Sequence, residues 1–304
     1  MTPEPGPRTV AVDLGKTTCR VRVGEPGAAP TRSGPGAPGL ASDLRADAAF
    51  AAIASLLATD ARDGASATAI GIGAAGVEAA PDAARRLAER VAERWNAGTV
   101  VASDVLTAHL GAFAGAAGTV LIAGTGAVAV GVGPDGDRRR ADGWGPWLGD
   151  EGSGRWIGQQ GLVAALRAGD GRGAQTILAE DAAALAGGLA ALPGFVGGDD
   201  AARRLASFAP TVLRRSAEGD PVAAHIVAEA TRLLAATASA VSPAGGDVAV
   251  VGGLADDHDF LHALEAALRE AGLAPRRPLG SAIDGAAILA RRHDLPHERY
   301  AIRV

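Results

Sequence analysis

The most informative segment of the chain reads Gly143-Trp144-Gly145-Pro146-Trp147-Leu148-Gly149-Asp150-Glu151-Gly152-Ser153-Gly154. It places two adjacent carboxylates, Asp150 and Glu151, in a glycine-dense loop just before a helical pattern. Glycine allows the backbone to approach a ligand closely, and binding residues are often carried by such loops. The segment therefore predicts a ligand-binding loop that leads into a helix.

Two further glycine turns each follow a strand-like run. The first lies in Asp13-Leu14-Gly15-Lys16-Thr17-Thr18-Cys19-Arg20, and the second is Gly124-Thr125-Gly126. Backbone N–H groups in such turns can hold a phosphate, and glycine is needed where a Cβ would block the approach. The three loops together predict a nucleotide phosphate site assembled from distant parts of the chain.

Side chains next to two of these turns suit the same ligand. Asp13 cannot bind phosphate directly, because like charges repel, but it can hold Mg²⁺ through water while the metal bridges phosphate oxygens. The hydroxyl groups of Thr17 and Thr125 can donate hydrogen bonds to those oxygens. We therefore expect Asp13 on the metal side of the site.

The composition favours a small-molecule partner. The 304 residues carry a net charge of -5 without a Lys/Arg-rich block, so no nucleic-acid surface is expected. Cys19 is the only cysteine, which rules out an intrachain disulfide and fits a reducing cytoplasm. The N-terminus lacks the pattern of a secretory signal, and the most apolar helical stretch, residues 222–241, contains charged side chains. We therefore expect a cytoplasmic protein without a membrane span.

The pattern of strands and helices predicts an α/β protein with two lobes, residues 1–115 and 116–304. Each lobe opens with a strand, a glycine turn and a second strand, which suggests duplication. A loop is expected over 24–39, a helical insertion follows residue 153, and the last helix, 281–292, is expected to pack back on the first lobe. The expected strands cover residues 8–13, 18–24, 68–73, 99–102, 119–123, 127–132 and 247–251.

Four motifs in this order resemble those of the N-acetylglucosamine kinase and BadF/BadG/BcrA/BcrD ATPase family. They are Asp-x-Gly-x-Thr-x-x-Arg at Asp13 to Arg20, Gly124-Thr125-Gly126, the Gly143 to Ser153 motif, and Val251-Gly252-Gly253. The resemblance spans nearly the whole chain. It implies an α/β fold of two RNase H-like, actin-like ATPase lobes with a central nucleotide cleft, with ATP and Mg²⁺ as cofactors. A homodimer is the family's usual state.

The resemblance also assigns roles in nucleotide binding and catalysis. It makes Asp13 to Thr17, with Gly15 and Lys16, the first phosphate loop, Gly124 to Gly126 the second, and Gly252-Gly253 the turn against the adenosine. In such kinases an aspartate after the last strand of the first lobe accepts the proton of the attacking sugar hydroxyl. Asp104, which follows the strand expected at 99–102, is therefore the expected catalytic base.

Sugar-binding residues are expected from both lobes. Asp150 and Glu151 can accept hydrogen bonds from sugar hydroxyls. In the first lobe, Gly76 would let the substrate approach the backbone. The resemblance also places the first three residues of the Gly143 to Ser153 motif on the substrate side, namely Gly143, Trp144 and Gly145.

One departure from the family leaves the identity of the sugar open. Sugar kinases of this family usually carry an asparagine in the loop after the opening hairpin, but residues 34–42 contain none. Ser42 and Asp43 are candidate replacements, and an acidic Asp43 would suit an amino sugar.

Two motifs have rival interpretations. Gly15-Lys16-Thr17 matches the end of a Walker A motif, but Val10 occupies the position of the earlier glycine. The spacing of Gly71, Gly73 and Gly76 fits a dinucleotide-binding fingerprint, but the next helix begins only near Pro81 and the expected acidic residue is missing. We therefore prefer the nucleotide site described above.

Several site residues also have structural interpretations. Asp13 could be a turn carboxylate. Asp104 could be the N-cap of the following helix, and Asp150 and Glu151 could cap the helix after Ser153. Trp144 and Trp147 are expected to be packing and loop anchors rather than stacking platforms. Residues 256–259 could form a metal cluster, but a solvated helix start is the favoured interpretation.

The favoured function is an ATP-dependent kinase that phosphorylates a hydroxyl of an amino sugar, N-acetylglucosamine or glucosamine, with Asp104 as base. One alternative is an ATPase that drives electrons from a cluster shared between subunits, for which Cys19 alone supplies too few thiolates. The other alternative is a noncatalytic, actin-like nucleotide-binding protein.

Overall fold

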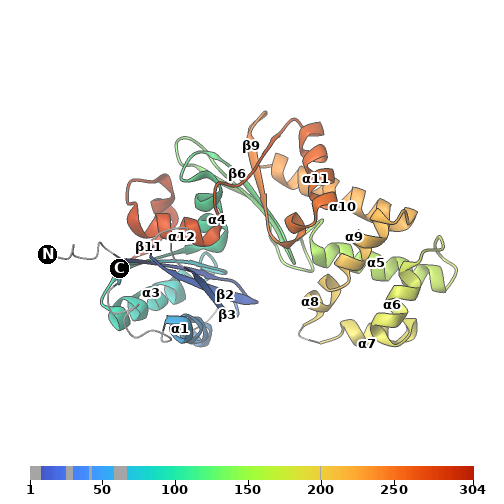
Figure 1. Cartoon of the computed structure of the whole chain (residues 1–304), viewed down its shortest axis with the longest axis horizontal. Coiled ribbons are helices and arrows are strands. Elements are labelled where there is room, and N and C mark those ends of the chain that lie inside the picture. Colours follow the sequence, from blue (N-terminus) through green and yellow to red (C-terminus); the bar gives the residue numbers. More distant parts are fainter. Residues whose placement is uncertain (1–7, 25–29, 41–42, 58–66, 199) are drawn as a thin grey trace. The chain divides into compact units, whose positions relative to one another are not determined.

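The computed structural model describes residues 8–24, 30–40, 43–57, 67–198 and 200–304. The chain forms two compact units (Figure 1). Unit 1 contains Met1–Ala117, Val132–Asp137 and Pro278–Val304, and unit 2 contains Gly118–Gly131 and Arg138–Arg277. Each unit is built around one β-sheet, and helices cover that sheet. Some neighbouring strands of each sheet come from distant parts of the chain. The predicted α/β class is therefore confirmed.

Unit 1 has a six-stranded sheet with the order β11-β5-β4-β1-β2-β3. Strands β1, β4 and β5 are parallel, and the β1-β2 hairpin that the sequence predicts is present. The strands of this sheet are β1 (Arg8–Leu14), β2 (Thr18–Val23), β3 (Thr31–Pro35), β4 (Ala67–Ala74), β5 (Gly98–Ser103) and β11 (Ile302–Arg303). The helices of unit 1 are α1 (Asp43–Leu57), α3 (Pro81–Trp95), α4 (Asp104–Phe113), α12 (Ala282–Arg291) and the short 3₁₀ helix η3 (Pro296–Tyr300).

Helices cover both faces of the unit 1 sheet. Helices α1 and α3 pack on one face over a core that includes Val12 and Ile72, and α4 and α12 lie on the other face (Figure 1). The parallel strands need both faces covered because their side chains are apolar on each side. The arrangement leaves the carboxyl ends of β1, β4 and β5 at one edge of the sheet.

The expected loop over residues 24–39 was wrong in part, because strand β3 occupies Thr31–Pro35 and pairs with β2. The five residues of β3 are exposed or only half buried in alternation, as expected of an edge strand. Apart from Pro35, their sequence contains no apolar side chain. The strand is therefore determined by backbone pairing with β2 rather than by a hydrophobic pattern that the sequence could reveal.

Helices α4 and α12 approach each other so closely that glycine is required at their contact. A Cβ at Gly285 would overlap the carbonyl oxygen of Thr107, and one at Gly111 would overlap that of Ser281. A Cβ at Gly71 of β4 would likewise overlap the carbonyl oxygen of Ala286. The three glycines therefore fix α12 against α4 and β4, and this contact supports the helix that Asp104 begins.

Unit 2 has a five-stranded sheet with the order β10-β9-β6-β7-β8, in which β6 and β9 are parallel. Its strands are β6 (Gly118–Ala123), β7 (Ala127–Val132), β8 (Arg138–Asp142), β9 (Asp247–Val251) and β10 (Ala274–Arg276). Its α-helices are α5 (Gly154–Gly169), α6 (Leu178–Ala186), α7 (Leu192–Val196), α8 (Ala201–Ala206), α9 (Ala209–Ala217), α10 (Pro221–Ser239) and α11 (His258–Glu270), with the 3₁₀ helices η1 (Leu189–Ala191) and η2 (Gly253–Asp256).

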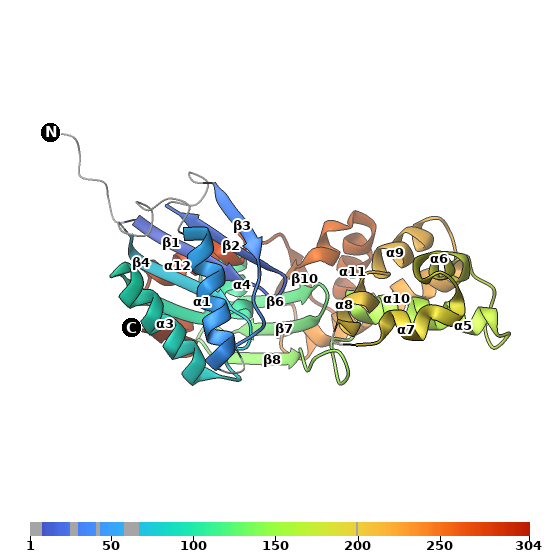
Figure 2. The same ribbon diagram turned by 90° about the horizontal axis from the view of Figure 1, so that it is seen from below.

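The insertion after residue 153 is helical, as the sequence predicts. Within unit 2, helices α6, α7 and α9 lie beyond the end of the sheet (Figure 2). They share a continuous hydrophobic core with the sheet and with α5 and α10, in which Phe208 and Phe260 are the largest buried side chains. No helix of the described residues combines the length and the apolar character needed to cross a membrane.

Two buried histidines connect α4 with η3 in unit 1. His109 Nδ1 and His297 Nε2 are 2.9 Å apart, and both side chains are inaccessible to solvent. Burial, with a smaller contribution from His109, lowers the pKa of His297 to about 4. Below the ordinary pKa of histidine, near 6.5, the unfolded chain therefore binds a proton at this position that the folded chain does not bind.

We expect this histidine to make the protein less stable as the pH falls from 6.5 towards 4. Between pH 7 and about pH 5, the free energy of unfolding should lose about 2 kcal/mol through His297 alone. Urea unfolding at both pH values should show that His297→Gln reduces this loss. The exposed His262 provides the matched control, and an equal reduction in His262→Gln would contradict the prediction.

Candidate functional site

The turn between β1 and β2 presents backbone donors at one edge of unit 1. The Gly15 N–H donates to Thr18 O across the turn, at 3.0 Å. The N–H groups of Lys16 and Thr17 have no acceptor within the described part of the chain. Because unpaired N–H donors in a tight turn form an anion-binding concavity, the turn is suited to hold a phosphate.

Gly36, which sequence analysis did not identify, packs against the backbone of this turn and hydrogen-bonds to it. Its N–H donates to Thr17 O (3.0 Å), and the next residue, Ala37, donates to Gly15 O (3.2 Å). A Cβ on Gly36 would overlap Gly15 O and would lie 2.6 Å from Thr18 N. The segment after β3 is therefore a part of the turn, although it lies about twenty residues further along the chain.

We expect Gly36→Ala to destabilise unit 1 by about 1–3 kcal/mol, because the new methyl group meets backbone atoms that have no free space to move into. Urea unfolding should detect the change. Gly98→Ala is the control, since a Cβ at Gly98 would meet only Thr68 O at 3.8 Å. If both variants unfold at the same urea concentration, the proposed role of Gly36 is wrong.

Asp13 and Asp104 both lie at the edge of the unit 1 sheet where the parallel strands have their carboxyl ends. Asp13 pairs in register with Gly73 of β4, Gly73 pairs with Ala102 of β5, and Asp104 comes two residues later. Burial raises the pKa of Asp13, although Arg20 opposes the shift from 3.3 Å. The structure therefore brings two of the predicted site residues to the same edge.

Asp104 is electrostatically linked to the first turn. Burial raises its pKa, and the charge of Asp13 raises it further, whereas the Val105 N–H and the charge of Lys16 lower it. Ser103, not Asp104, is the N-cap of α4, because its Oγ accepts from the Leu106 N–H at 3.3 Å. The N-cap interpretation of Asp104 was therefore wrong, and its half-buried carboxylate accepts instead from the Val105 N–H at 2.9 Å.

In unit 2 the turn Gly124 to Gly126 also presents free donors. Its inner hydrogen bond runs from Gly124 N to Gly126 O (2.9 Å), and its carbonyls accept from the first N–H groups of α5. The N–H groups of Thr125 and Gly126 have no acceptor among the residues that the structure describes. This turn therefore offers a second pair of backbone donors, as the sequence predicts for a phosphate loop.

The glycine pair after β9 lies beside this turn. Gly252 has a φ of +107°, a conformation that favours glycine, and a Cβ there would lie 2.6 Å from Ala123 O. The ideal Cβ position of Gly124 lies 3.8 Å from Gly253 N. The structure thus brings the second predicted phosphate loop and the predicted adenosine turn together within unit 2.

The acidic loop before α5 is folded against the same turn. Asp150 has a φ of +56°, and its Oδ1 accepts from the Ala127 N–H at 3.3 Å. Ser153 is the N-cap of α5, because its Oγ accepts from the Trp156 N–H at 3.2 Å. The capping interpretation of Asp150 and Glu151 was therefore wrong, and the Asp150 carboxylate lies over the second glycine turn instead.

The two tryptophans of this loop are not packing anchors. The side chains of Trp144 and Trp147 are 72% and 68% exposed, so neither is fixed in a core. The guanidinium of Arg140 lies 5.7 Å from the ring centre of Trp144. Positive φ angles at Gly143 (+74°) and Gly145 (+90°) turn the backbone on either side of that ring. The packing-anchor interpretation was wrong, and both rings are available to contact a ligand or a partner surface.

The remaining predictions fall on other parts of the structure. Gly76 of unit 1 has a φ of +86°, and a Cβ there would lie 2.9 Å from Leu40 N. Ser42 and the side chain of Asp43 lie outside the described residues. Asp257 caps α11 by accepting from the Phe260 N–H (2.9 Å), which confirms a helix start at 256–259. Among the described residues, no group of three or more His, Cys, Asp or Glu side chains could hold a metal.

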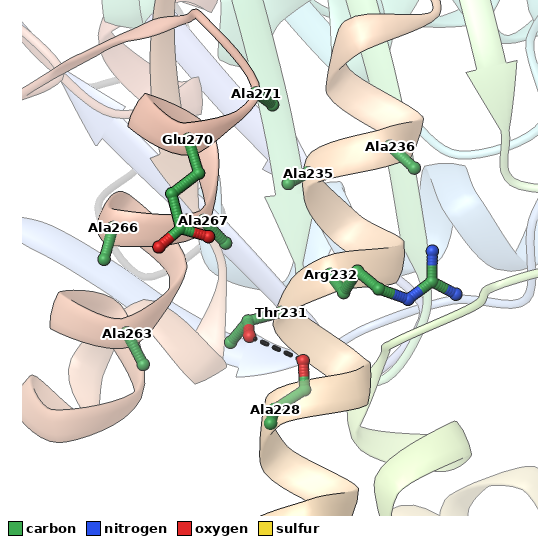
Figure 3. Close-up of a pocket in the computed structure, with 10 residues that line it drawn as sticks. All are labelled: Ala228, Thr231, Arg232, Ala235, Ala236, Ala263, Ala266, Ala267, Glu270 and Ala271. Atoms are coloured by element: carbon green, nitrogen blue, oxygen red, sulfur yellow. Dashed lines mark hydrogen bonds between the residues drawn. The ribbon is translucent and has the colours of Figure 1, made fainter.

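A shallow cavity of about 570 Å³ lies between α10 and α11 of unit 2 (Figure 3). It contains none of the site residues that the sequence predicts. The residues that line it are mostly alanines: Ala228, Thr231, Arg232, Ala235, Ala236, Ala263, Ala266, Ala267, Glu270 and Ala271. The candidate site consequently rests on the loops at the strand ends and not on this cavity.

Curated relatives are similar to short parts of the chain. The N-acetylmuramic acid/N-acetylglucosamine kinase of Clostridium acetobutylicum is 40% identical over 82 residues, which cover 27% of each chain. The N-acetyl-D-glucosamine kinase of Dictyostelium discoideum is 44% identical over 63 residues, or 21% of this chain and 20% of the relative. The matched segments thus span about a quarter or a fifth of these relatives.

Solved structures are similar over nearly the whole chain. A Chromobacterium violaceum protein assigned as an N-acetylglucosamine kinase has a TM-score of 0.76 at 27% identity, covering 94% of this chain and 99% of that one. A ROK family glucokinase from Streptomyces griseus, solved with glucose and AMPPNP, has a TM-score of 0.60 at 21% identity, covering 93% and 99%. These likenesses confirm the fold expected from the resemblance.

The sequence profile of one family matches residues 10–290, which is most of the chain. This range includes the two glycine turns, the acidic loop and the glycine pair described above. The resemblance drawn from the motifs is therefore confirmed. The chain belongs to the BadF/BadG/BcrA/BcrD ATPase family.

Proposed function

We propose that the protein is an ATP-dependent kinase that transfers the γ-phosphate of ATP to a hydroxyl of an amino sugar, N-acetylglucosamine in the first place. The observation that carries the proposal is the half-buried Asp104 carboxylate, which interacts electrostatically with Asp13 and Lys16 and is not the N-cap of its helix. A carboxylate whose pKa is raised by burial and by a second carboxylate is typical of a functional group. The kinases among the relatives and solved structures give the substrate class.

The glycine turns supply the phosphate donors in this proposal. The N–H groups of Lys16 and Thr17 in unit 1, and of Thr125 and Gly126 in unit 2, would donate to phosphate oxygens, together with the threonine hydroxyls. The glycine pair Gly252-Gly253 would lie against the adenosine. Such preorganised donors stabilise the charge that develops on the transferred phosphoryl group, and they require no rearrangement during the reaction.

Asp13 would hold the Mg²⁺ of the MgATP substrate through water. The chemistry of the edge fits a cation, because burial raises the pKa of both Asp13 and Asp104, although Arg20 lowers that of Asp13, and the Val105 N–H and Lys16 lower that of Asp104. A divalent cation would relieve this unfavourable burial of negative charge. Asp104 would then accept the proton of the attacking sugar hydroxyl as general base.

The sugar would be bound by Asp150 and Glu151 and by the backbone at Gly76, Gly143 and Gly145, with Trp144 against its apolar face. Carboxylates accept hydrogen bonds from vicinal hydroxyls, and aromatic rings pack on apolar surfaces. We further propose that the protein is cytoplasmic and forms a homodimer, which is the usual state in the family. Sedimentation velocity would test the dimer. We expect it to bind neither nucleic acid nor a membrane.

A coupled assay of ADP release across a panel of sugars tests the proposed function. N-acetylglucosamine, glucosamine, N-acetylmuramic acid and N-acetylmannosamine should be compared with glucose, and NMR of the product should identify the phosphorylated hydroxyl. We expect ADP release to depend on an amino sugar. If no sugar accelerates ADP release although ATP binds, the noncatalytic, actin-like alternative is favoured instead.

A further inference from the structure

Asp142, the last residue of β8, uses both oxygens of its carboxylate within the acidic loop. Oδ1 accepts from the Asp150 N–H at 2.8 Å, and Oδ2 accepts from the Glu151 N–H at 2.9 Å. The residue itself has a φ of +61°, which turns its backbone into the loop. Hydrogen bonds to an ionised acceptor are roughly twice as strong as neutral ones, so this contact fixes the backbone that carries both carboxylates.

The loop closes over Asp142 without room for a side chain at Gly149. A Cβ at Gly149 would overlap Asp142 Oδ1 and would lie 3.0 Å from the Cβ of Trp144. The glycine is therefore required by the contact with Asp142, although its own φ is not positive. The absence of a side chain at Gly149 and the two hydrogen bonds that the Asp142 carboxylate accepts together define one conformation of the segment from Gly149 to Glu151.

Arg155 fixes the same segment from its other side. Only 5% of the residue is exposed, and its Nη2 donates to Gly149 O at 2.6 Å while Nη1 donates to Gln159 Oε1 at 2.7 Å. Burial lowers the pKa of Arg155, and the charges of Asp150, Asp142 and Glu151 act against that shift. A buried cation thus interacts with the charges of three carboxylates and offsets their mutual repulsion.

The segment from Gly149 to Glu151 also contacts the second glycine turn, Gly124 to Gly126. Asp150 Oδ1 accepts from the Ala127 N–H, and its Oδ2 lies 3.0 Å from the position of a Cβ at Gly126. On the other side of the loop, the Gly154 N–H donates to Gly124 O at 2.7 Å. A displacement of Asp150 would therefore disturb both the acidic loop and the turn with the free Thr125 and Gly126 donors.

We infer that Asp142 is a positioning residue, which orients Asp150 and Glu151 for the sugar and joins the acidic loop to the phosphate turn of unit 2. The inference rests on the proposed function for the identity of the two ligands. Asp142 itself touches neither ligand in this account. Its effect is preorganisation, because both loops are held before the substrates bind and little ordering remains to be done on binding.

The test compares Asp142→Asn with wild type and with Asp135→Asn. An asparagine has the shape of aspartate but only one acceptor oxygen, so one of the two N–H groups loses its partner. Asp135 is the matched control, because its Oδ1 also accepts a backbone N–H, that of Asp137, at 3.2 Å, in an exposed turn of unit 1. Two readouts are needed: steady-state kinetics, and hydrogen exchange of a peptide covering residues 143–153.

We expect Asp142→Asn to raise the KM for the sugar roughly tenfold or more, as for the loss of a charged hydrogen bond, and to change kcat less. Exchange in peptide 143–153 should become faster, while Asp135→Asn should leave both readouts at their wild-type values. A merely structural role would lower the melting temperature without separating KM from kcat.

Two outcomes would overturn the inference. One is unchanged exchange in peptide 143–153 of Asp142→Asn, because the loop would then not depend on this carboxylate. The other is faster exchange with an unchanged KM for the sugar, because the loop would then be anchored without serving the substrate. Wild-type protein that phosphorylates no sugar would instead refute the proposed function, and the exchange readout would still decide whether Asp142 anchors the loop.

Discussion

Replacing Asp104 with asparagine should lower kcat by roughly 10²–10⁴-fold and leave the KM for ATP nearly unchanged. Asparagine preserves the size of the side chain but cannot accept a proton from a sugar hydroxyl. Nucleotide affinity should persist, since the proposed phosphate donors belong to the two glycine turns. Steady-state kinetics with saturating amino sugar, together with calorimetric titration of ATP, would measure both effects.

The same substitution should make the folded protein more stable at neutral pH. Burial raises the pKa of Asp104 in the folded state, so between the unfolded value near 3.8 and the folded value the folded chain binds more protons than the unfolded chain. Stability therefore falls as the pH rises through that window, and the full penalty applies above it. Asp104→Asn removes the charge and with it the penalty.

A gain in melting temperature combined with a loss of turnover would separate a catalytic role from a structural one. If the Asp104 carboxylate capped α4, its replacement would lower the stability of the folded protein, but Ser103 caps this helix. Asp82→Asn in the first turn of α3 is the control, because Asp82 is an exposed acidic residue at the start of another helix of unit 1. Full turnover in Asp104→Asn would refute the assignment of the base.

The strands and the two glycine turns could be predicted because their signals are local. Runs with several β-branched residues that end in glycine, such as the one before Gly124, combine a β-forming composition with a backbone that must turn. The N-caps were within reach for the same reason, since Ser103 and Ser153 directly precede helical patterns. Sequence analysis nevertheless named the neighbouring Asp104 and Asp150 as the alternative caps, because aspartate and serine both favour that position.

The residues that were missed act through contacts between separated segments. Gly36 matters because its backbone lies against the turn at Gly15, and nothing in its own neighbourhood shows that contact. Asp142 matters because its left-handed backbone brings its carboxylate to residues eight and nine positions later. The exposure of Trp144 and Trp147 was missed because a tryptophan is usually buried, and only the loop geometry shows otherwise.

The site residues also differ in what their burial implies. Arg155 is a buried cation whose neighbours are carboxylates, so its charge is compensated within the protein. Asp13 and Asp104 are half-buried carboxylates at the same sheet edge, and burial raises the pKa of both although Arg20, Lys16 and the Val105 N–H act against the shifts. Uncompensated negative charge at a sheet edge lowers the stability of the folded chain, and its retention there is expected where a cation is to be bound.

Asp13→Asn should therefore weaken the use of Mg²⁺ more than that of the sugar. If Asp13 holds the metal through water, its loss should lower kcat/KM for MgATP roughly 10–100-fold, as for outer-shell metal partners, and shift the Mg²⁺ concentration for half-maximal activity upward. Because its pKa is raised in the folded protein, protons and Mg²⁺ compete for the wild-type carboxylate, and higher Mg²⁺ should extend its activity to lower pH. The variant should lose that dependence.

A titration of activity against Mg²⁺ at several pH values would measure both effects. Asp47→Asn is the matched control, since Asp47 also pairs with an arginine, Arg90, but is largely exposed and lies away from the turn on helix α1. A structural role for Asp13 would change the fraction of active protein and leave the midpoint of the Mg²⁺ titration in place. An unchanged midpoint together with an unchanged pH dependence would show that the carboxylate does not serve the metal, and the edge of unit 1 would then need another explanation for its two half-buried acids.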